Sequence, residues 1–580
     1  MKKERLHLTT LLCLLAAGVL FTTGCKNTVS YTETTDSNGE TTVICTVYAS
    51  DLKRLTSDDL AQKEFGNTYT ISLLGKWKNE ELGWLGKTLH DISGRHITLD
   101  MTQIEGNTSI ETYAFMYCSS LEKVIMGNNI TSIDDSGFYG CSSLKSINIP
   151  DSVKSIGRSA FDRCSSLTSI IIPEGITTIR ESAFDMCTSL TSVTIPDSVK
   201  SIGRGAFNLC TSLTSITIPD SITSIDEQAF DQCYSLKTVY AGSIENWLSI
   251  SFDNPIGYNA NPCSNGAALY LKGKLATNIV IPDGTTNIGR NAFAGCTSIT
   301  GITIPDSVTV IGERAFYDCR SLASITIEGV TRIDECAFYS CESLKSITLG
   351  DNVTLVGFSI FDGCSDYTLT VGANFVSKDY GESYDGGYVF RSSLASLFKG
   401  YKAVIIKDGV TRIGNCVFFG SGEFLLESVT IPETVTDIGD YAFDCCGSLK
   451  SINIPNSVTT IGKGAFRGCG FTNVTIPNRV TVIDDHTFWG CPLTSIEIPN
   501  GVIKIGDAAF AECTSLESIT IPETVTKIGN FVFQSTALTT VIFTGTVAQW
   551  YMIEKSGWKN NGLTGKVICS NGEVELGQWE

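Results

Sequence analysis

The hydrophobic positions of this chain recur with a period of 22 or 23 residues. Phenylalanine marks the register sixteen times in three blocks, and the spacing within a block departs from this period only between Phe418 and Phe443, where it is 25. One repeat has too little apolar surface to fold alone, whereas stacked repeats cover each other's apolar faces. The periodicity therefore predicts a solenoid of about sixteen stacked coils. The register residues are Phe115, Phe138, Phe161, Phe184, Phe207, Phe230, Phe293, Phe316, Phe338, Phe361, Phe418, Phe443, Phe466, Phe488, Phe510 and Phe533.

The repeat from Cys187 to Cys210 predicts the elements of one coil. Apolar and polar residues alternate at 190–195, which predicts a short strand, and Pro196 ends this strand. A second short extended segment follows at 199–202. The remaining residues predict a short turn or a single helical coil that buries Phe207. Stacking such coils gives a parallel sheet whose strands lie ~4.8 Å apart.

The outward strand position between two inward residues is often threonine. We interpret this pattern as β-propensity and cross-strand threonine contacts, and an ice-binding surface is the alternative. As a protein-binding face, the sheet is broad, polar and weakly charged, which suits low-affinity multivalent adhesion better than one deep pocket. The residues are Thr194, Thr217, Thr303, Thr326, Thr348, Thr430, Thr475 and Thr520.

The consensus Leu-x-x-Ile-x-Ile-Pro-x-x-Val-x-x-Ile-Gly-x-x-Ala-Phe-x-x-Cys resembles the Treponema-type, or BspA-like, leucine-rich repeat. Residues 155–161 and 518–522 are two of many matching segments, and the resemblance covers roughly 97–543. It implies a leucine-rich-repeat solenoid, which is a β-rich fold of stacked parallel strands with short helical turns and capped ends. It also implies a bacterial surface or secreted protein. Several kinds of family member bind host matrix or plasma proteins, such as fibronectin and fibrinogen, or other bacteria. No binding residue is carried over, because the matching positions are the structural ones.

The first 25 residues predict an export signal. A basic start precedes a mostly apolar stretch from Leu8 to Phe21, which is short for a bilayer span. The sequence Thr22-Thr23-Gly24-Cys25 then resembles a bacterial lipobox, although Thr22 stands where an aliphatic residue is usual. We expect Cys25 to be acylated and to anchor the mature protein at the outer membrane or cell surface. An ordinary secretory signal and a secreted protein are the alternative.

Breaks in the repeat predict the organisation of the rest of the chain. Strands are expected at 43–48 and 68–73, and a helix is expected at 79–92. The predicted segments are a signal peptide at 1–25, a flexible tether at 26–42, an N-terminal cap region at 43–96, repeat arrays at 97–239, 275–364 and 402–543, insertions at 240–274 and 365–401, and a C-terminal capping module at 544–580.

The first insertion and the C-terminal tail follow one plan. Trp247 precedes the motif Cys-Ser-Asn-Gly at 263–266, and Trp550 precedes the same motif at 569–572. We interpret both segments as covers in which the tryptophan packs over a coil end. The alternative is an aromatic contact site for a partner or a glycan, which makes both tryptophans candidate ligand contacts.

The second insertion, at 365–401, is rich in glycine and tyrosine. Long loops on a rigid scaffold often carry binding function, and tyrosine offers a large contact area at low entropic cost. Tyr380, Tyr384 and Tyr388 are therefore candidate ligand contacts, and a passive loop is the alternative.

Fourteen of the 22 cysteines lie three residues after a register phenylalanine. We interpret this column as small buried hydrophobic residues. A disulfide ladder is the alternative, because neighbouring coils are close enough for bridging. No Cys-x-x-Cys motif or local Cys/His cluster in the sequence indicates a metal or redox site.

Composition narrows the class of function. The net charge of −19, spread over 580 residues, argues against binding to nucleic acid or adsorption to anionic lipid. Asp484, Asp485 and His486 could form an acid–base group, but they lie where neighbouring repeats carry ordinary polar residues. We therefore predict no enzyme and no cofactor. The predicted function is that of a lipid-anchored surface protein that binds proteins, including host matrix or plasma proteins, or cell-surface glycans. A structural or interbacterial scaffold without a host ligand is the alternative.

Overall fold

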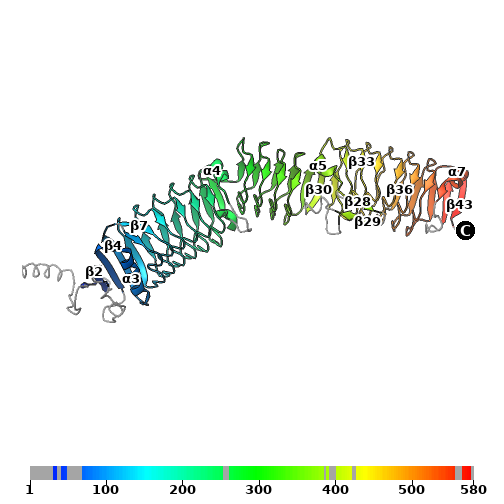
Figure 1. Cartoon of the computed structure of the whole chain (residues 1–580). Helices are drawn as coiled ribbons and strands as arrows, with labels where there is room; N and C mark the ends of the chain where they lie inside the picture. Colours follow the sequence, from blue (N-terminus) through cyan, green and yellow to red (C-terminus); the bar gives the residue numbers. More distant parts are fainter. Residues whose placement is uncertain are drawn as a thin grey trace, which may run out of the picture. The chain divides into compact units, whose positions relative to one another are not determined.

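A computed structural model of the chain describes residues 30–35, 41–48, 52, 68–106, 108–252, 260–379, 381–384, 387–390, 400–420, 426–555 and 565–576. The chain forms two compact units: the first unit spans Met1–Ala276 and Gly289–Ser298, and the second unit spans Thr277–Ile288 and Ile299–Glu580. Each unit is a stack of coils whose strands form parallel ladders (Figure 1). Within the described ranges, no helix has both the length and the apolar character needed to cross a membrane.

Coils of the first unit contribute strands to two columns. The first column contains β1 (Ser30–Thr35), β2 (Thr41–Tyr48), β3 (Thr68–Lys76), β4 (His96–Glu105), β6 (Leu121–Met126), β8 (Ser146–Asn148), β10 (Ser169–Ile171), β12 (Ser192–Thr194), β14 (Ser215–Ile218), β16 (Thr238–Ala241), β17 (Ala268–Leu271) and β18 (Lys274–Leu275). The second column contains β5 (Thr108–Ile110), β7 (Ile130–Ile133), β9 (Ser155–Ile156), β11 (Thr178–Ile179), β13 (Ser201–Ile202) and β15 (Ser224–Ile225). Its helices include α3 (Asn79–His90), α4 (Ile244–Ser249) and the 3₁₀ helix η3 (Pro262–Asn265).

The second unit repeats this plan. Its first column contains β19 (Asn278–Val280), β21 (Gly301–Thr303), β23 (Ser324–Ile327), β25 (Ser346–Leu349), β27 (Tyr367–Val371), β30 (Tyr401–Ile406), β32 (Ser428–Thr430), β36 (Ser495–Glu497), β38 (Ser518–Ile521), β40 (Thr540–Phe543), β42 (Gly565–Cys569) and β43 (Gly572–Leu576). Its second column contains β20 (Asn287–Ile288), β22 (Val310–Ile311), β24 (Arg332–Ile333), β26 (Leu355–Val356), β31 (Arg412–Ile413), β33 (Asp437–Ile438), β34 (Thr460–Ile461), β35 (Val482–Ile483), β37 (Lys504–Ile505), β39 (Lys527–Ile528) and β41 (Glu554–Lys555). The other elements include α5 (Ala373–Val376), the hairpin of β28 (Gly381–Tyr384) and β29 (Gly387–Phe390), and α7 (Val547–Met552).

The strand register places equivalent residues of neighbouring coils side by side. In β23 and β25, Ile325 pairs with Ile347 and Thr326 pairs with Thr348. Both isoleucines are buried, whereas Thr326 is exposed. Because side chains alternate between the two faces of a strand, one sequence period gives one apolar column inside and one polar column outside. The predicted alternation is confirmed.

The register phenylalanines form the stacked core that the period predicts. In the first unit, the ring centroid of Phe161 lies 5.5 Å from that of Phe138 and 5.4 Å from that of Phe184. The rings are parallel within 3°, and all three side chains are fully buried. Identical rings at identical positions therefore stack in parallel from one coil to the next.

The column cysteines pack in the core as thiols without disulfide bonds. Cys187 Sγ donates a hydrogen bond of 3.2 Å to the backbone oxygen of Phe161, in the preceding coil, and the same bond recurs along the column. All fourteen column cysteines are buried, and none of them forms a disulfide. Burial raises the pKa of the Cys118 thiol to about 12, so the sulfur stays protonated. The packing interpretation is confirmed, and the described residues contain no disulfide ladder.

The segment around each phenylalanine is a series of turns and not a helical coil. In the coil of Phe184, the N–H groups of Ser182, Phe184 and Met186 donate to the backbone oxygens of Arg204, Ala206 and Asn208 in the next coil. Ser182 and Met186 have φ of 51° and 55°, which is the left-handed region. The helical alternative is wrong, because these N–H groups bond across coils instead of along the chain.

The estimate of about sixteen coils is too low. Strands β3, β16, β17, β27, β40 and β42 belong to further coils that lack a register phenylalanine. Counting phenylalanines missed these coils because helices or insertions replace the usual turn segment.

The expected elements before the array are confirmed as β2, β3 and α3. The flexible tether predicted at 26–42 is wrong for Ser30–Thr35, which form β1 and pair antiparallel with β2. Backbone hydrogen bonds hold an edge strand without requiring an apolar face, so the polar sequence of this segment was a poor guide.

Candidate functional site

The predicted contact residues fall in different environments. Cys25 and Tyr380 lie outside the described residues. Tyr384 ends β28 and Tyr388 lies in β29, and the two strands pair as an antiparallel hairpin. The tyrosine contacts of the second insertion therefore stay a prediction.

Both candidate tryptophans are core residues. Trp247, in α4, is fully buried, and its indole N–H donates a hydrogen bond of 2.8 Å to the backbone oxygen of Ala292. Trp550, in α7, is also fully buried, and its ring packs edge-on against Phe543 at 5.3 Å. Neither indole lies on the surface where a ligand contact was expected. The position of both rings corresponds to the cover interpretation, since large aromatic side chains stabilise most when they are buried.

The shared Cys-Ser-Asn-Gly motif marks two different structures. At 263–266 its first three residues lie in η3, and Gly266, with φ of 88°, caps the end of that helix before β17. At 569–572 it forms the turn between β42 and β43, so Cys569 and Gly572 lie in a hairpin. The structural counterpart of that hairpin is β17 and β18. The first insertion and the C-terminal tail therefore both contain a helix followed by a hairpin. The two copies of the motif, however, lie at positions that are not structurally equivalent.

The acidic residues near His486 have structural roles. The Asp485 carboxylate accepts a hydrogen bond of 2.9 Å from the backbone N–H of Asp507, in the next coil. Asp484 accepts one of 2.9 Å from the backbone N–H of Asp485. Burial, more than any nearby charge, lowers the pKa of His486. Within the described ranges, no group of three or more His, Cys, Asp or Glu residues is arranged to hold a metal ion.

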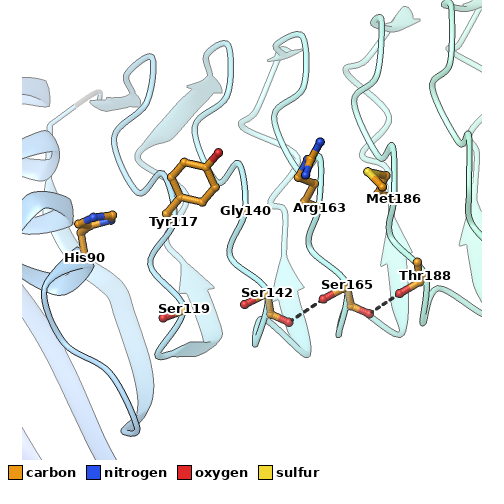
Figure 2. A pocket seen from close by; sticks show the side chains of 9 residues that line it. All are labelled: His90, Tyr117, Ser119, Gly140, Ser142, Arg163, Ser165, Met186 and Thr188. Carbon is orange, nitrogen blue, oxygen red and sulfur yellow. Dashed lines mark hydrogen bonds between the residues drawn. The ribbon is translucent and has the colours of Figure 1, made fainter.

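A surface hollow that combines aromatic, basic and hydroxyl groups lies on the first unit. We call it the side groove; its volume is about 590 Å³. Figure 2 shows two rows of residues along it, one residue per coil in each row. The upper row contains Tyr117, Gly140, Arg163 and Met186, with His90 at its end, and the hydroxyl row contains Ser119, Ser142, Ser165 and Thr188.

The upper row is rigid because its backbone is bonded across coils. The N–H of Tyr117 donates to the backbone oxygen of Tyr139 at 2.7 Å, and that of Arg163 donates to Asp185 at 2.8 Å. These residues have φ of 58° and 62°, and the other members of the row also lie in the left-handed region. The left-handed backbone conformation is unfavourable for residues other than glycine. The hydrogen bonds between coils therefore stabilise this conformation in the upper row.

The hydroxyl row is tied to the same coils. Ser165 Oγ donates to the backbone oxygen of Ser142 at 3.2 Å, and Thr188 Oγ1 donates to that of Ser165 at 3.3 Å (Figure 2). Each of these hydroxyls keeps lone pairs that can accept a further hydrogen bond. Ser119 and Ser142 are exposed. The row therefore offers evenly spaced polar groups along one side of the groove.

Helix α3 closes one end of the side groove. Leu82, Leu85 and Leu89 of α3 are buried against the stack. A Cβ at Gly86 would lie 1.6 Å from the backbone oxygen of Ala114, so only glycine allows this close approach. The approach brings the ring of His90, in the last turn of α3, to 6.4 Å from that of Tyr117.

Arg163 supplies an accessible positive charge. Its side chain is 55% exposed, whereas the neighbouring Asp162 side chain is only 12% exposed and lies 3.9 Å away. Burial, and secondarily the nearby Asp185, raises the pKa of Asp162 to about 6. The carboxylate therefore lies below the surface while the guanidinium stays available at the groove.

Sequence reasoning missed the groove residues. A usable signal was present in the position two residues after each register phenylalanine, which holds Tyr117, Gly140, Arg163 and Met186 in consecutive repeats. Side chains that vary while the frame stays constant are typical of a recognition surface on a repeat scaffold.

The repeats themselves are recognised at the family level. The family model for the BspA type leucine rich repeat region (6 copies) matches residues 108–241, 268–380, 396–460 and 436–560. The chain belongs to this family. Leucine-rich repeat solenoids typically serve as scaffolds for protein–protein interaction, and the side groove lies within the matched BspA type repeats apart from the contribution of α3.

Several solved structures of bacterial leucine-rich repeat proteins are similar to the chain. A leucine-rich repeat protein from Bacteroides ovatus is 19% identical, with 94% of this chain and 100% of that chain covered and a TM-score of 0.27. A leucine rich cell surface protein from Faecalibacterium prausnitzii is 23% identical, with 91% and 98% covered and a TM-score of 0.22. The T. pallidum leucine rich repeat protein is 20% identical, with 50% and 87% covered and a TM-score of 0.21. No curated protein matches the chain at a significant level.

Proposed function

We propose that this BspA type leucine-rich repeat protein is exported and lipid-anchored at the cell surface. There it binds a macromolecular ligand on other cells or in the host matrix, and the side groove is its contact surface. The observation that supports this best is the upper row, where tyrosine, arginine and methionine replace each other on a fixed frame. These residue types are enriched at the energetically important centres of interfaces.

The scaffold suits binding because it presents this row without reorganisation. Every coil along the groove is bonded to the next through the turn segment, and some neighbouring coils are also bonded through paired strands. A preorganised surface avoids the entropic cost of ordering loops on association. The solenoid can therefore bind a ligand with useful affinity through a modest contact area.

The proposed anchor is the acylated Cys25, which would hold the mature chain at a membrane by its acyl groups. Metabolic labelling with a radioactive fatty acid should label the wild-type protein and leave Cys25→Ala unlabelled. Fractionation of cells that express both forms gives a second readout. Equal labelling of the two forms would contradict the anchor while leaving the groove proposal untouched.

Binding is tested with variants that keep the left-handed backbone. Asparagine tolerates this conformation well, so Tyr117→Asn and Met186→Asn remove the groove side chains with little strain. Gln232→Asn is the matched control, because Gln232 has φ of 55° at the equivalent position but does not line the groove.

The readout is binding of each purified variant to immobilised matrix proteins, glycans and whole cells. We expect a loss of about tenfold or more in affinity for the two groove variants and no change for the control. Equal binding by all three variants would place the contact elsewhere. Absence of binding by the wild-type protein to every target would favour a structural or interbacterial scaffold.

A further inference from the structure

We propose that the side groove binds a linear acidic glycan, a chain of hexopyranose units bearing carboxylates that lies across successive coils. This inference rests on the proposed function, since it names the ligand class of the same groove. The rows of the groove supply four independent arguments for it: repeat distance, hydroxyl groups, an aromatic floor and charge.

The repeat distance of the groove favours a glycan over an extended peptide or a polyproline helix. Successive phenylalanine centroids beneath it are 5.2, 5.5 and 5.4 Å apart from Phe115 to Phe184. One pyranose unit of an extended glycan advances by a similar length, so each sugar would meet one coil. An extended peptide presents side chains on one face every ~6.7 Å, and a polyproline helix every ~9 Å. A peptide in either of these two conformations would therefore lose register within two coils.

The hydroxyl row matches the polar edge of a sugar chain. The hydroxyl hydrogens of Ser165 and Thr188 are used in bonds to the preceding coil, so these oxygens face a ligand as acceptors. Ser119 and Ser142 are exposed hydroxyls that can donate as well as accept. Sugar hydroxyls donate and accept too, so one such pair can form in each coil.

The upper row supplies an apolar floor. A Cβ at Gly140 would lie 2.4 Å from Cδ1 of Tyr117, which means that the absence of a side chain at Gly140 lets the Tyr117 ring lie over it. Tyr117 as a whole is 45% exposed. The electron-rich face of its ring attracts the slightly positive C–H groups on the flat side of a pyranose. Met186, two coils beyond Gly140, extends the apolar surface.

The charge of the groove favours an acidic chain. No aspartate or glutamate is among the residues that line it, although the protein as a whole carries a net charge of −19. The exposed guanidinium of Arg163 can form paired hydrogen bonds to a carboxylate. His90 marks one end of the row, and Tyr117 and Gly140 separate it from Arg163. This spacing suits a glycan with a carboxylate on some units and not on all.

Titration calorimetry on the full chain tests the inference with defined probes. The acidic probe is a hexasaccharide that alternates uronic acid with N-acetylhexosamine, and the neutral probe is a hexasaccharide of 1,4-linked glucose. We expect the acidic probe to bind at least about tenfold more tightly, and Arg163→Gln to reduce its affinity by about tenfold. Arg204→Gln is the matched control: Arg204 is 54% exposed, forms one ion pair to Glu227, and lies outside the groove.

Three results would overturn the glycan. The first is equal binding of the two hexasaccharides, and the second is an equal effect of Arg163→Gln and Arg204→Gln on the affinity for the acidic probe. The third is equally tight binding of a poly-glutamate peptide, which would indicate a protein ligand or unspecific attraction. The proposed function has a separate test in cell adhesion. Groove-dependent adhesion that resists glycosidase treatment but is lost after protease treatment would refute the glycan and keep the function. Adhesion unchanged by Tyr117→Asn and Arg163→Gln would refute the function of the groove itself.

Discussion

Truncation of one phenylalanine in the stacked column measures how strongly the coils hold each other. Phe338 is fully buried in the second unit, with the ring of Phe316 at 5.1 Å on one side and that of Phe361 at 5.3 Å on the other. The rings are within 3° and 17° of parallel. Phe338→Ala removes both ring contacts and leaves a cavity between two coils.

The magnitude follows from how little that cavity can collapse. The backbone N–H of Phe338 donates to the oxygen of Ile360 at 2.9 Å, so bonds across the stack fix the separation of the coils. Buried phenylalanine-to-alanine changes cost ~3–5 kcal/mol, and poorly relaxing sites lie at the upper end. We therefore expect a loss of about 4–5 kcal/mol in the free energy of unfolding of the second unit.

Phe358 is the matched control, since it is 79% exposed in the following coil. Phe358→Ala should change stability by less than ~0.5 kcal/mol. Urea denaturation followed by circular dichroism gives both values from the midpoint and slope. Hydrogen exchange near residues 336–341 adds a local readout, because long repeat arrays can unfold in segments. A loss for Phe338→Ala no larger than that for Phe358→Ala would refute the stacked core.

Three further outcomes follow from the packing. Because its pKa in the folded chain is raised from 3.8 to about 6, Asp162 favours folding most below pH 4 and this contribution is lost as pH rises through 6. Asp162→Asn should therefore raise the free energy of unfolding by ~1–3 kcal/mol at pH 7 and by nothing near pH 4, and equal urea midpoints at pH 7 would contradict this. Thiol titration without reductant should find the fourteen column cysteines silent in the folded protein and reactive in urea, whereas few reactive thiols in urea would indicate disulfides. Trp247→Phe should cost ~1–3 kcal/mol by loss of the bond to Ala292, against less than ~0.5 kcal/mol for Trp84→Phe at an exposed position, and similar melting of the two variants would argue against the buried indole.

The sequence by itself determined the coil. Alternation at 190–195, the stop at Pro196 and the spacing of Phe207 were sufficient to predict a strand, its end and a buried ring in each repeat. These features depend on interactions between residues close in the chain or one full period apart. In a repeated sequence both kinds of interaction recur in every repeat. The sequence was therefore sufficient to predict the family and the packing of the cysteine column.

The tertiary structure alone decided which surface residues meet. Tyr117, Arg163 and Met186 are separated by whole coils in the sequence, and α3 reaches them only because Gly86 allows close packing. The same limit explains why Trp247 could be placed as a cover or as a contact, and why two identical Cys-Ser-Asn-Gly motifs form unlike structures. Local pattern fixes how one coil folds. Which side chains are exposed, and which of them lie together, depends on the surface that the neighbouring coils and the covering elements do not bury. Only the assembled stack defines that surface.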